Sequence, residues 1–313
     1  MKRIFELGSK DFMTLGKQEI LSTIKNSEGR SVMAEVVVTA LPLIYGVSGL
    51  EMAAAFGADM ITLNLFDFDN PFIFGIDEID LSNGVNAISM IEQKIRENQK
   101  NPDYIRNAKN IIGRFIGVNL EPVPVGINYP EGRKLKAENL IKAKELGFDY
   151  ILITGNPNTG VTHRAILEGI EEAAELIGDK VIIMAGKMHA AGEENIYDSS
   201  ICKDFVKAGA DVILIPAPGT IPGMDQKMAR CQIETIHECQ ALALTSIGTS
   251  QESSSEDTIE QIALMSKMAG ADIQHIGDAG YCGMAFPENI MALSIAIRGK
   301  RHTYRRMAYS LKR

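Results

Sequence analysis

The sequence lacks the features that mark membrane-spanning, secreted and nucleic-acid-binding proteins. No stretch is long and apolar enough for a transmembrane helix, which needs about 18 or more apolar residues. The amino-terminal stretch MKRIFELGSKDFMTLGKQEI carries charges throughout and has no apolar centre of a secretory signal. The net charge is −8, whereas a nucleic-acid surface requires basic stripes. We therefore expect a cytoplasmic protein that binds neither a membrane nor nucleic acid.

Cysteine is scarce, and the common catalytic signatures are missing. The four cysteines, Cys202, Cys231, Cys239 and Cys282, show no CxxC spacing and are typical of reduced packing residues in a cytosolic protein. No HxH or HExxH pattern indicates zinc. No Walker loop, nucleophile elbow or dinucleotide fingerprint is present. Candidate chemistry therefore has to be read from the expected fold.

The sequence does contain a regular alternation of apolar runs and helical periodicity. The expected strands are 32–40, 59–66, 115–122, 149–155, 180–187, 211–217, 241–248 and 272–277, and the expected helices are 47–56, 102–112, 137–146, 162–177, 197–208, 225–239, 255–269 and 287–297. Nearly continuous apolar strands indicate a parallel sheet covered by helices. The pattern predicts an α/β fold, a single (β/α)8 TIM barrel spanning residues 1–313. A doubly wound open sheet is the alternative, which the missing GxGxxG disfavours.

Four related stretches recur at every second strand: AFGADMITLNLFD, ELGFDYILITGNPNTG, KAGADVILIPAPGT and AGADIQHIGDAGYCGM. In each, a glycine ends the preceding helix and an aspartate opens the strand, namely Asp59, Asp149, Asp211 and Asp272. We interpret these aspartates as turn and stability residues at the floor of the barrel. The recurrence is consistent with a barrel built by duplication of two-strand units.

Three segments exceed the minimal barrel. Residues 1–30 predict a helix that closes the floor. Residues 67–101 form an insertion after strand two, which is typical of a lid or a subunit contact. Residues 299–313 are basic, and we expect a solvated final helix or a contact with an acidic patch of another subunit.

The insertion and the basic carboxyl-terminal tail suggest that the protein is a homo-oligomer. We expect a monomer to expose apolar side chains of these segments to water. The residues are Phe66, Phe68, Phe72, Ile73 and Phe74.

In a TIM barrel the active site lies at the carboxyl ends of the strands, so candidates can be taken in strand order. Lys187 ends an apolar run, and we expect its stem to lie in the barrel mouth, where burial lowers the pKa of the amine. Lys187 is then a Schiff-base residue or a fixed cation, His189 a general acid/base, and Glu35 or Glu121 a partner. The expected ligand-binding residues are Asn64, Asn119, Thr154, Asn156, His275 and Asp278.

The turns after strands seven and eight are rich in glycine. Backbone amides there predict a phosphate or carboxylate site, since glycine lets the backbone approach an anion. The alternative is that the glycines only permit tight turns, and Asp278 counts against an anion. The expected phosphate-binding residues are Gly248, Thr249, Ser250, Gly277, Gly280 and Gly283.

In strand order and in these glycine-rich turns, the chain resembles the phosphate-binding TIM-barrel superfamily. The stretch GVSGLEMAAAFGADMITLN also looks like the start of phosphoenolpyruvate-mutase-like barrels. Asp67 and Asp69 offer oxygen ligands suited to Mg²⁺, although DFDN is equally a turn with solvated carboxylates.

These observations lead to one main functional hypothesis and two alternatives. The first is a lyase, aldolase or isomerase that acts on a small, anionic, phosphorylated or carboxylated carbonyl compound and requires no cofactor. The second is a Mg²⁺-dependent carbon–carbon or carbon–phosphorus lyase that resembles the mutase-like barrels. The third is a non-catalytic barrel that senses a metabolite, because the fold does not fix the function.

Overall fold

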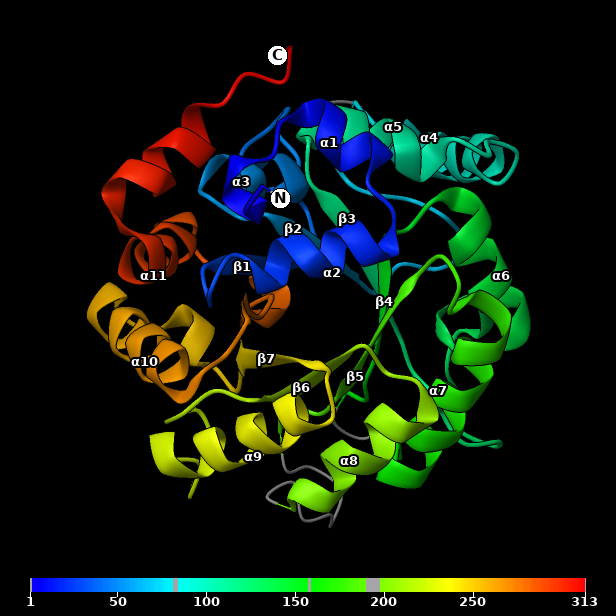
Figure 1. The fold of residues 1–313 in the computed structure, drawn as a ribbon. Coiled ribbons are helices and arrows are strands. Elements are labelled where there is room, and N and C mark those ends of the chain that lie inside the picture. The colour runs from blue at the N-terminus through cyan, green and yellow to red at the C-terminus, as the bar shows by residue number, and fades with distance from the viewer. Residues whose placement is uncertain (1, 81–83, 157–158, 190–197, 313) are drawn as a thin grey trace.

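The computed structural model describes residues 2–80, 84–156, 159–189 and 198–312 and shows a closed parallel barrel of eight strands (Figure 1). All eight predicted strands are confirmed, and the predicted fold class is correct. The strands are β1 (Ser31–Val37), β2 (Met60–Asn64), β3 (Phe115–Leu120), β4 (Tyr150–Ile153), β5 (Ile182–Gly186), β6 (Val212–Pro216), β7 (Leu242–Ile247) and β8 (Ile273–Ile276). The barrel closes where β1 pairs with β8.

Helices surround the barrel as an outer ring (Figure 1). The eight predicted helices are present, and the insertion contains one more, α4. The helices are α1 (Ser9–Thr14), α2 (Lys17–Lys25), α3 (Gly49–Ala55), α4 (Gly84–Asn98), α5 (Tyr104–Ile112), α6 (Ala137–Leu146), α7 (His163–Ile177), α8 (Ser199–Ala208), α9 (Gln226–Glu238), α10 (Glu256–Ala269) and α11 (Pro287–Ala308). Short 3-10 helices are η1 (Ile4–Glu6), η2 (Glu131–Arg133), η3 (Gln251–Ser253) and η4 (Gly280–Cys282).

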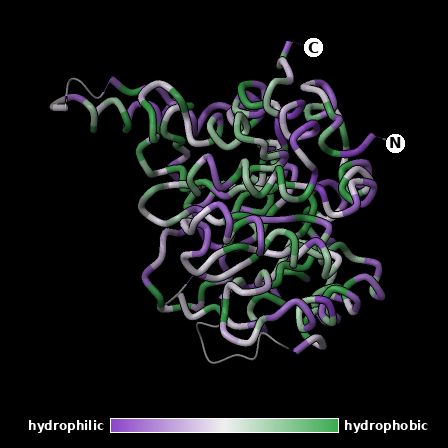
Figure 2. Tube along the Cα trace, turned by 90° about the vertical axis from the view of Figure 1, so that its left-hand side faces the viewer, coloured by the Kyte–Doolittle hydropathy of each residue, from purple (hydrophilic) through white to green (hydrophobic). Residues whose placement is uncertain are grey.

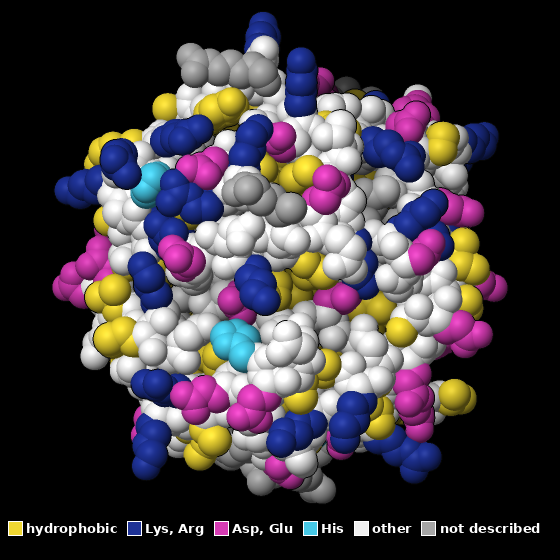
Figure 3. Space-filling model, in the orientation of Figure 1, with side chains coloured by type: hydrophobic (Ala, Val, Ile, Leu, Met, Phe, Trp, Pro, Cys, Tyr) yellow, Lys and Arg dark blue, Asp and Glu magenta, His cyan; other side chains and the backbone are white. Residues whose placement is uncertain are grey.

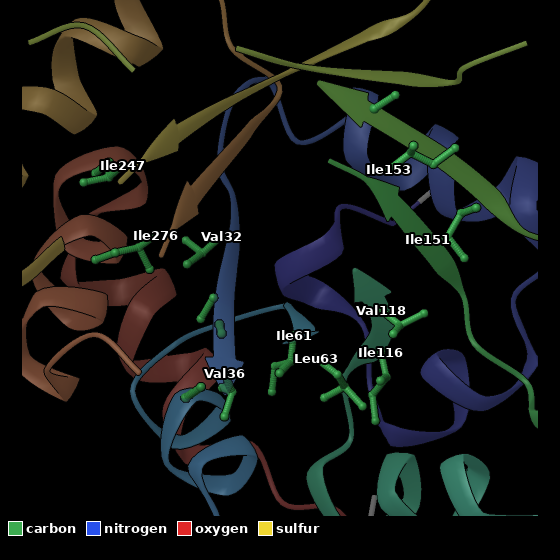
Figure 4. Close-up of a cluster of buried hydrophobic side chains, with 14 of the residues drawn as sticks. Val32, Val36, Ile61, Leu63, Ile116, Val118, Ile151, Ile153, Ile247 and Ile276 are labelled. Carbon is green, nitrogen blue, oxygen red and sulfur yellow. The ribbon is translucent and has the colours of Figure 1, made fainter. Parts of the chain in front are cut away.

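Two separate apolar cores hold the fold together. The larger core lies between strands and helices, and Figure 4 shows its outward-pointing side chains, such as Val36, Leu63 and Ile151. The smaller core fills the lower barrel, where Met33, Met184 and similar side chains meet the amino-terminal helices. Because both faces of every strand are buried, the strands read as continuous apolar runs. Figure 2 shows this apolar interior beneath a more polar outside.

The amino-terminal segment closes the floor of the barrel, with α2 crossing it in Figure 1. Ile4, Phe5, Phe12, Ile20 and Ile24 are buried against the amino ends of the strands. On this face, Lys and Arg side chains are interspersed with Asp and Glu side chains (Figure 3). The expected helix is broken into α1 and α2, whose first residues follow Gly8 and Gly16.

The four recurring aspartates form one repeated hydrogen-bond motif at the floor. Each accepts a backbone N–H from the preceding odd strand and returns its own backbone N–H to the same residue. Asp59 pairs in this way with Val32, Asp149 with Ile116, Asp211 with Ile183 and Asp272 with Ala243. Each carboxylate also meets a cationic or basic side chain: Arg298, Lys109, Lys17 and His237 respectively. These are structural contacts, as the sequence predicted.

A glycine inside β3 makes room for a large side chain that crosses the barrel. A Cβ at Gly117 would lie 2.0 Å from Cε2 of Tyr150, which no real contact permits. The Tyr150 hydroxyl lies 2.9 Å from the Thr62 hydroxyl and shares a hydrogen bond with it. The pair forms the boundary between the apolar lower barrel and its polar upper part.

The insertion after β2 is packed into the protein, so the prediction that its aromatic residues are exposed is wrong. Phe66, Phe68, Phe72 and Ile73 are at most 6% exposed, and Phe74 is half-buried. Phe66 lies edge-on to Phe68 and to Phe148 from the neighbouring strand–helix unit. The argument for an oligomer from these residues is thereby lost, and the oligomeric state remains a prediction.

The basic carboxyl-terminal segment is not simply solvated either. Helix α11 kinks at Gly299, whose φ is 75°, and its second half returns over the amino-terminal segment. Arg306 is 2% exposed and donates to the Leu7 carbonyl at 3.0 Å. Arg306 therefore anchors the two ends of the chain to one another, whereas Lys300, Arg301 and Arg305 are exposed. Within the described residues, no helix is long and apolar enough to cross a membrane.

Candidate functional site

The upper interior of the barrel is polar, in contrast to its lower half. Side chains alternate along a strand, so residues two positions beyond the inner core also face the interior. By this rule Met33 is followed by Glu35, Leu244 by Ser246 and Ile273 by His275. These polar side chains lie towards the carboxyl ends of the strands, where TIM barrels carry their active sites.

Four polar side chains lie next to one another in the buried interior, from β3 through β1 and β8 to β7. Asn119 Nδ2 donates to Glu35 Oε1 at 2.5 Å. Glu35 Oε2 lies 3.5 Å from His275 Nε2, and His275 Nδ1 lies 2.7 Å from Ser246 Oγ. Glu35 is 3% exposed and His275 is fully buried. The structure thus brings together three residues predicted separately and adds Ser246.

Burial shifts the pKa values of both Glu35 and His275 away from those that favour an ion pair, despite their short distance. Burial raises the pKa of the Glu35 carboxyl well above its usual value, and the Asp278 carboxylate raises it further. Burial also lowers the pKa of His275 to about 3. Each shift favours the uncharged form, because desolvation penalises charge of either sign. An ion pair between the two side chains is therefore disfavoured.

A second group of carboxylates stands at the turns that follow β7 and β8. Asp278 accepts hydrogen bonds from Asn64 Nδ2 at 2.6 Å and from the Gly280 backbone N–H at 2.8 Å. Glu252, on η3, is 8% exposed. Burial raises the pKa of Glu252, and Asp278 adds to the effect. Sequence reasoning missed Glu252 because it lies in a serine-rich stretch with no local signal of burial.

The predicted phosphate turns have the backbone freedom that was expected of them. Thr249 and Ser250 have positive φ values of 56° and 77°, and Gly280 and Gly283 have values of 61° and 82°. The Thr249 hydroxyl donates to the Thr220 carbonyl. Both turns lead into short 3-10 helices, η3 and η4, rather than into long helix termini. The neighbouring carboxylates oppose an anion at this point.

The other predicted residues of these turns have close neighbours. A Cβ at Gly248 would lie 2.7 Å from Met188 Sδ, and one at Gly277 would lie 3.2 Å from the Ile247 carbonyl oxygen. Glycine at these two positions therefore allows close packing as well as turning.

Lys187 lies at the rim of β5, but its stem does not follow the expected path into the barrel. It is 5% exposed, its Nζ donates to the Val161 carbonyl at 3.2 Å, and it lines a small hollow with residues of α7 and α8. Met188 packs on the inner core instead. The reason is that side chains alternate along β5: Met184 faces the inner core, so positions 186 and 188 also face inward and position 187 faces outward.

His189 has a neutral ring next to this rim. Its Nε2 lies 2.9 Å from the Gly155 carbonyl oxygen, so Nε2 carries the proton and Nδ1 the lone pair. Burial lowers the pKa of His189, and the positive charge of Lys187 contributes. Residues 190–197, which continue this loop, lie outside the described part of the chain.

Glu121 belongs to a third cluster, above β3 and β4. It accepts from the Asn156 backbone N–H at 2.9 Å and from the Tyr129 hydroxyl at 2.6 Å. The pKa of Tyr129 is raised by burial and by the Glu121 charge. Thr154 is buried nearby, and its backbone N–H donates to the Leu120 carbonyl. Tyr129 was not predicted, since it lies in a loop without periodicity.

Asp67 and Asp69 are engaged in a turn and an ion pair. Asp67 Oδ1 accepts the Asp69 backbone N–H at 2.8 Å, and Asp69 Oδ1 lies 2.9 Å from Lys142 Nζ. Throughout the described ranges, no group of three or more His, Cys, Asp or Glu side chains is arranged to hold a metal ion. The magnesium hypothesis therefore gains no support from these contacts.

Comparison with known proteins supports the fold and the family. The carboxyl transferase domain of Rhizobium etli pyruvate carboxylase has a TM-score of 0.50 and 13% identity, over 96% of this chain and 51% of that one. An archaeal fructose 1,6-bisphosphate aldolase has a TM-score of 0.48 and 13% identity, over 92% of this chain and 98% of that one. Thiamine phosphate pyrophosphorylase from Pyrococcus furiosus has a TM-score of 0.44 and 13% identity, over 86% of this chain and 96% of that one.

At this identity the similarity shows a shared TIM-barrel fold and nothing about the reaction. It singles out neither the phosphate-binding nor the mutase-like barrels. No curated protein matches the chain significantly in sequence. The model of one family does match nearly the whole chain, residues 5–313, so the chain belongs to that family, which is described as Domain of unknown function (DUF7916).

Proposed function

We propose that this protein is an enzyme of the lyase, aldolase or isomerase type that moves protons on a small carbonyl-containing metabolite. The observation that carries the proposal is the buried Glu35–His275 pair at the carboxyl-terminal end of the barrel, 3.5 Å apart, in which burial raises the pKa of the carboxyl group. A buried carboxyl group with a raised pKa is suited to act as a general acid, and such perturbed groups are typical of active sites.

The proposed chemistry needs one acid and one base. Glu35 donates its proton to the carbonyl oxygen of the substrate while a base removes a proton from the neighbouring carbon or hydroxyl group. His189 is the candidate base, because burial lowers the pKa of its ring and so favours the uncharged form that accepts a proton. Loss of the carbon-bound proton gives an enol or enediol. Loss of the hydroxyl proton breaks the carbon–carbon bond and gives two products: a new carbonyl compound, and the enol of the second fragment, whose oxygen has taken the proton from Glu35. These proton transfers use no external oxidant or reductant.

The surrounding residues hold the acid in place. Asn119 fixes one Glu35 oxygen through its 2.5 Å hydrogen bond, and Ser246 fixes the far nitrogen of His275. A group held by such contacts needs no reorganisation when charge develops in the transition state.

The test is hydrogen exchange in D₂O. The wild-type protein is incubated with a panel of small aldehydes, ketones and their phosphorylated forms, and NMR follows deuterium entering the carbon next to the carbonyl. We expect Glu35→Gln to slow the exchange by about 100-fold or more, which is the usual contribution of one general acid. Glu256→Gln, at the exposed first residue of α10, is the matched control and should exchange like wild type.

Equal exchange by Glu35→Gln and wild type would refute the role of Glu35. If one panel compound binds tightly but wild type exchanges none of them, the protein is a metabolite sensor instead.

A further inference from the structure

We propose that the ligand of the barrel mouth carries an ammonium group, which Glu252 and Asn119 bind. The inference deepens the proposed function, and it rests on the mouth being the ligand site. It concerns charge and hydrogen bonding, whereas the proposed function concerns proton transfer, so the two can fail separately.

The first observation is a buried carboxylate oxygen without a donor. Glu252 is 8% exposed, and in the described part of the chain its Oε2 has no hydrogen-bond partner. A Cβ at Gly277 would lie 3.8 Å from Glu252 Cγ. Gly277 follows His275 by two positions, so its missing side chain would point into the barrel. The Glu252 side chain therefore lies beside Gly277, at the edge of the mouth.

The second observation is that the side-chain oxygen of Asn119 is also buried without a hydrogen-bond donor among the described residues. Asn119 is 7% exposed and uses its Nδ2 on Glu35. Its Oδ1 is buried and has no hydrogen-bond partner among the described residues. A buried acceptor without a donor is unfavourable, and native proteins satisfy nearly all such groups. Two orphaned acceptors on β3 and η3 favour a ligand that donates hydrogen bonds.

The charges around these acceptors decide between a neutral donor and a cationic one. Glu252, Asp278 and Glu121 all raise the pKa of Glu35, which places three further carboxyl groups within electrostatic range of it. Such a field repels anions and attracts cations. An ammonium group brings up to three donors and one positive charge, and therefore meets both requirements. The carboxyl groups are not grouped as a metal site in the described ranges.

The test compares three two-carbon probes of nearly equal size: ethanolamine, ethylene glycol and glycolate. Their binding to the full-length protein is measured at pH 7 by ligand-observed NMR titration. We expect ethanolamine to bind at least about tenfold more tightly than the neutral or anionic probe. Glu252→Gln keeps the shape and removes the charge, so it should weaken ethanolamine binding about tenfold and leave the other probes unchanged.

Two further variants keep the outcome interpretable. Gly277→Ala fills the space beside Glu252 and should also weaken ethanolamine binding, while Glu256→Gln should bind like wild type. The proposal is overturned if glycolate binds more tightly than ethanolamine, or if ethylene glycol binds equally well. It is also overturned if ethanolamine does not bind up to about 100 mM, or if Glu252→Gln binds it as wild type does. Intact ethanolamine binding with unchanged exchange in Glu35→Gln would refute only the proton transfer.

Discussion

The pH dependence of stability tests whether His275 is truly neutral in the folded protein. Its pKa falls from 6.5 to about 3 on folding, because the ring is fully buried. Between these values the unfolded chain binds a proton that the folded chain does not, so stability decreases as the pH falls through this window. The full shift of about 3.5 pK units corresponds to about 5 kcal/mol at the acid end.

The measurable part of this effect lies near neutrality. Lowering the pH from about 7.5 to about 5 should remove about 2 kcal/mol of the free energy of unfolding through His275 alone. We therefore expect the stability of wild type to decrease by about 2 kcal/mol more than that of His275→Gln over this range. Urea unfolding followed by circular dichroism, at several pH values, gives both curves.

Glu35 changes the stability in the opposite direction as the pH changes, and the comparison of wild type with His275→Gln takes this into account. Its raised pKa means that stability is lost as pH rises above its usual 4.5 towards the folded value. This contribution is present in both wild type and His275→Gln and cancels in their difference. His302, a partly exposed histidine tilted against Phe5, also has a pKa that burial lowers. His302→Gln should therefore reduce the pH dependence in the same direction as His275→Gln but by less, because its ring keeps more contact with water. A wild-type-minus-His275→Gln difference that does not change with pH would refute the buried neutral histidine.

Two further predictions concern packing. Gly117→Ala should lower the free energy of unfolding by about 3 kcal/mol or more, since the new methyl group overlaps the Tyr150 ring. The double variant with Tyr150→Leu should recover part of this loss. Equal chemical denaturation midpoints for Gly117→Ala and wild type would contradict this packing. Asp59→Ala should cost about 3–5 kcal/mol, because it leaves a fully buried arginine without its carboxylate. Asp272→Ala is its matched control, with a partner that is 42% exposed. A loss as large at Asp272 as at Asp59 would show that burial of the partner is not the cause.

The barrel itself could be predicted because its signals are local. Strands buried on both faces must be apolar throughout, so each of the eight appears as a run in the sequence. The recurring aspartates were equally readable, since a glycine that ends a helix and an aspartate that opens a strand are neighbours in the chain. The Asp59 motif, for example, uses the backbone of a strand only 27 residues away.

The candidate site was only partly readable, because its contacts join distant parts of the chain. Glu35 and His275 were both selected as strand-end residues, yet only closure of β1 on β8 brings them together in a buried pair. The stem of Lys187 was expected in the barrel mouth because the apolar run before it does not show which of its residues face inward; in the structure Met184 and Met188 do. Glu252 carries no local signal at all.

The sequence by itself determined the number, order and type of the elements, since these depend on periodicity and on turn residues within a few positions. Only the tertiary structure decided which polar groups lose their water. That depends on what covers them, as α5 and the neighbouring units cover Phe66 and as the amino-terminal segment covers Arg306. Loss of water raises the pKa of Glu35. It also leaves Glu252 Oε2 and Asn119 Oδ1 buried without a hydrogen-bond donor among the described residues. The chemistry of this barrel mouth therefore follows from burial, which is a property of the fold and not of any single segment.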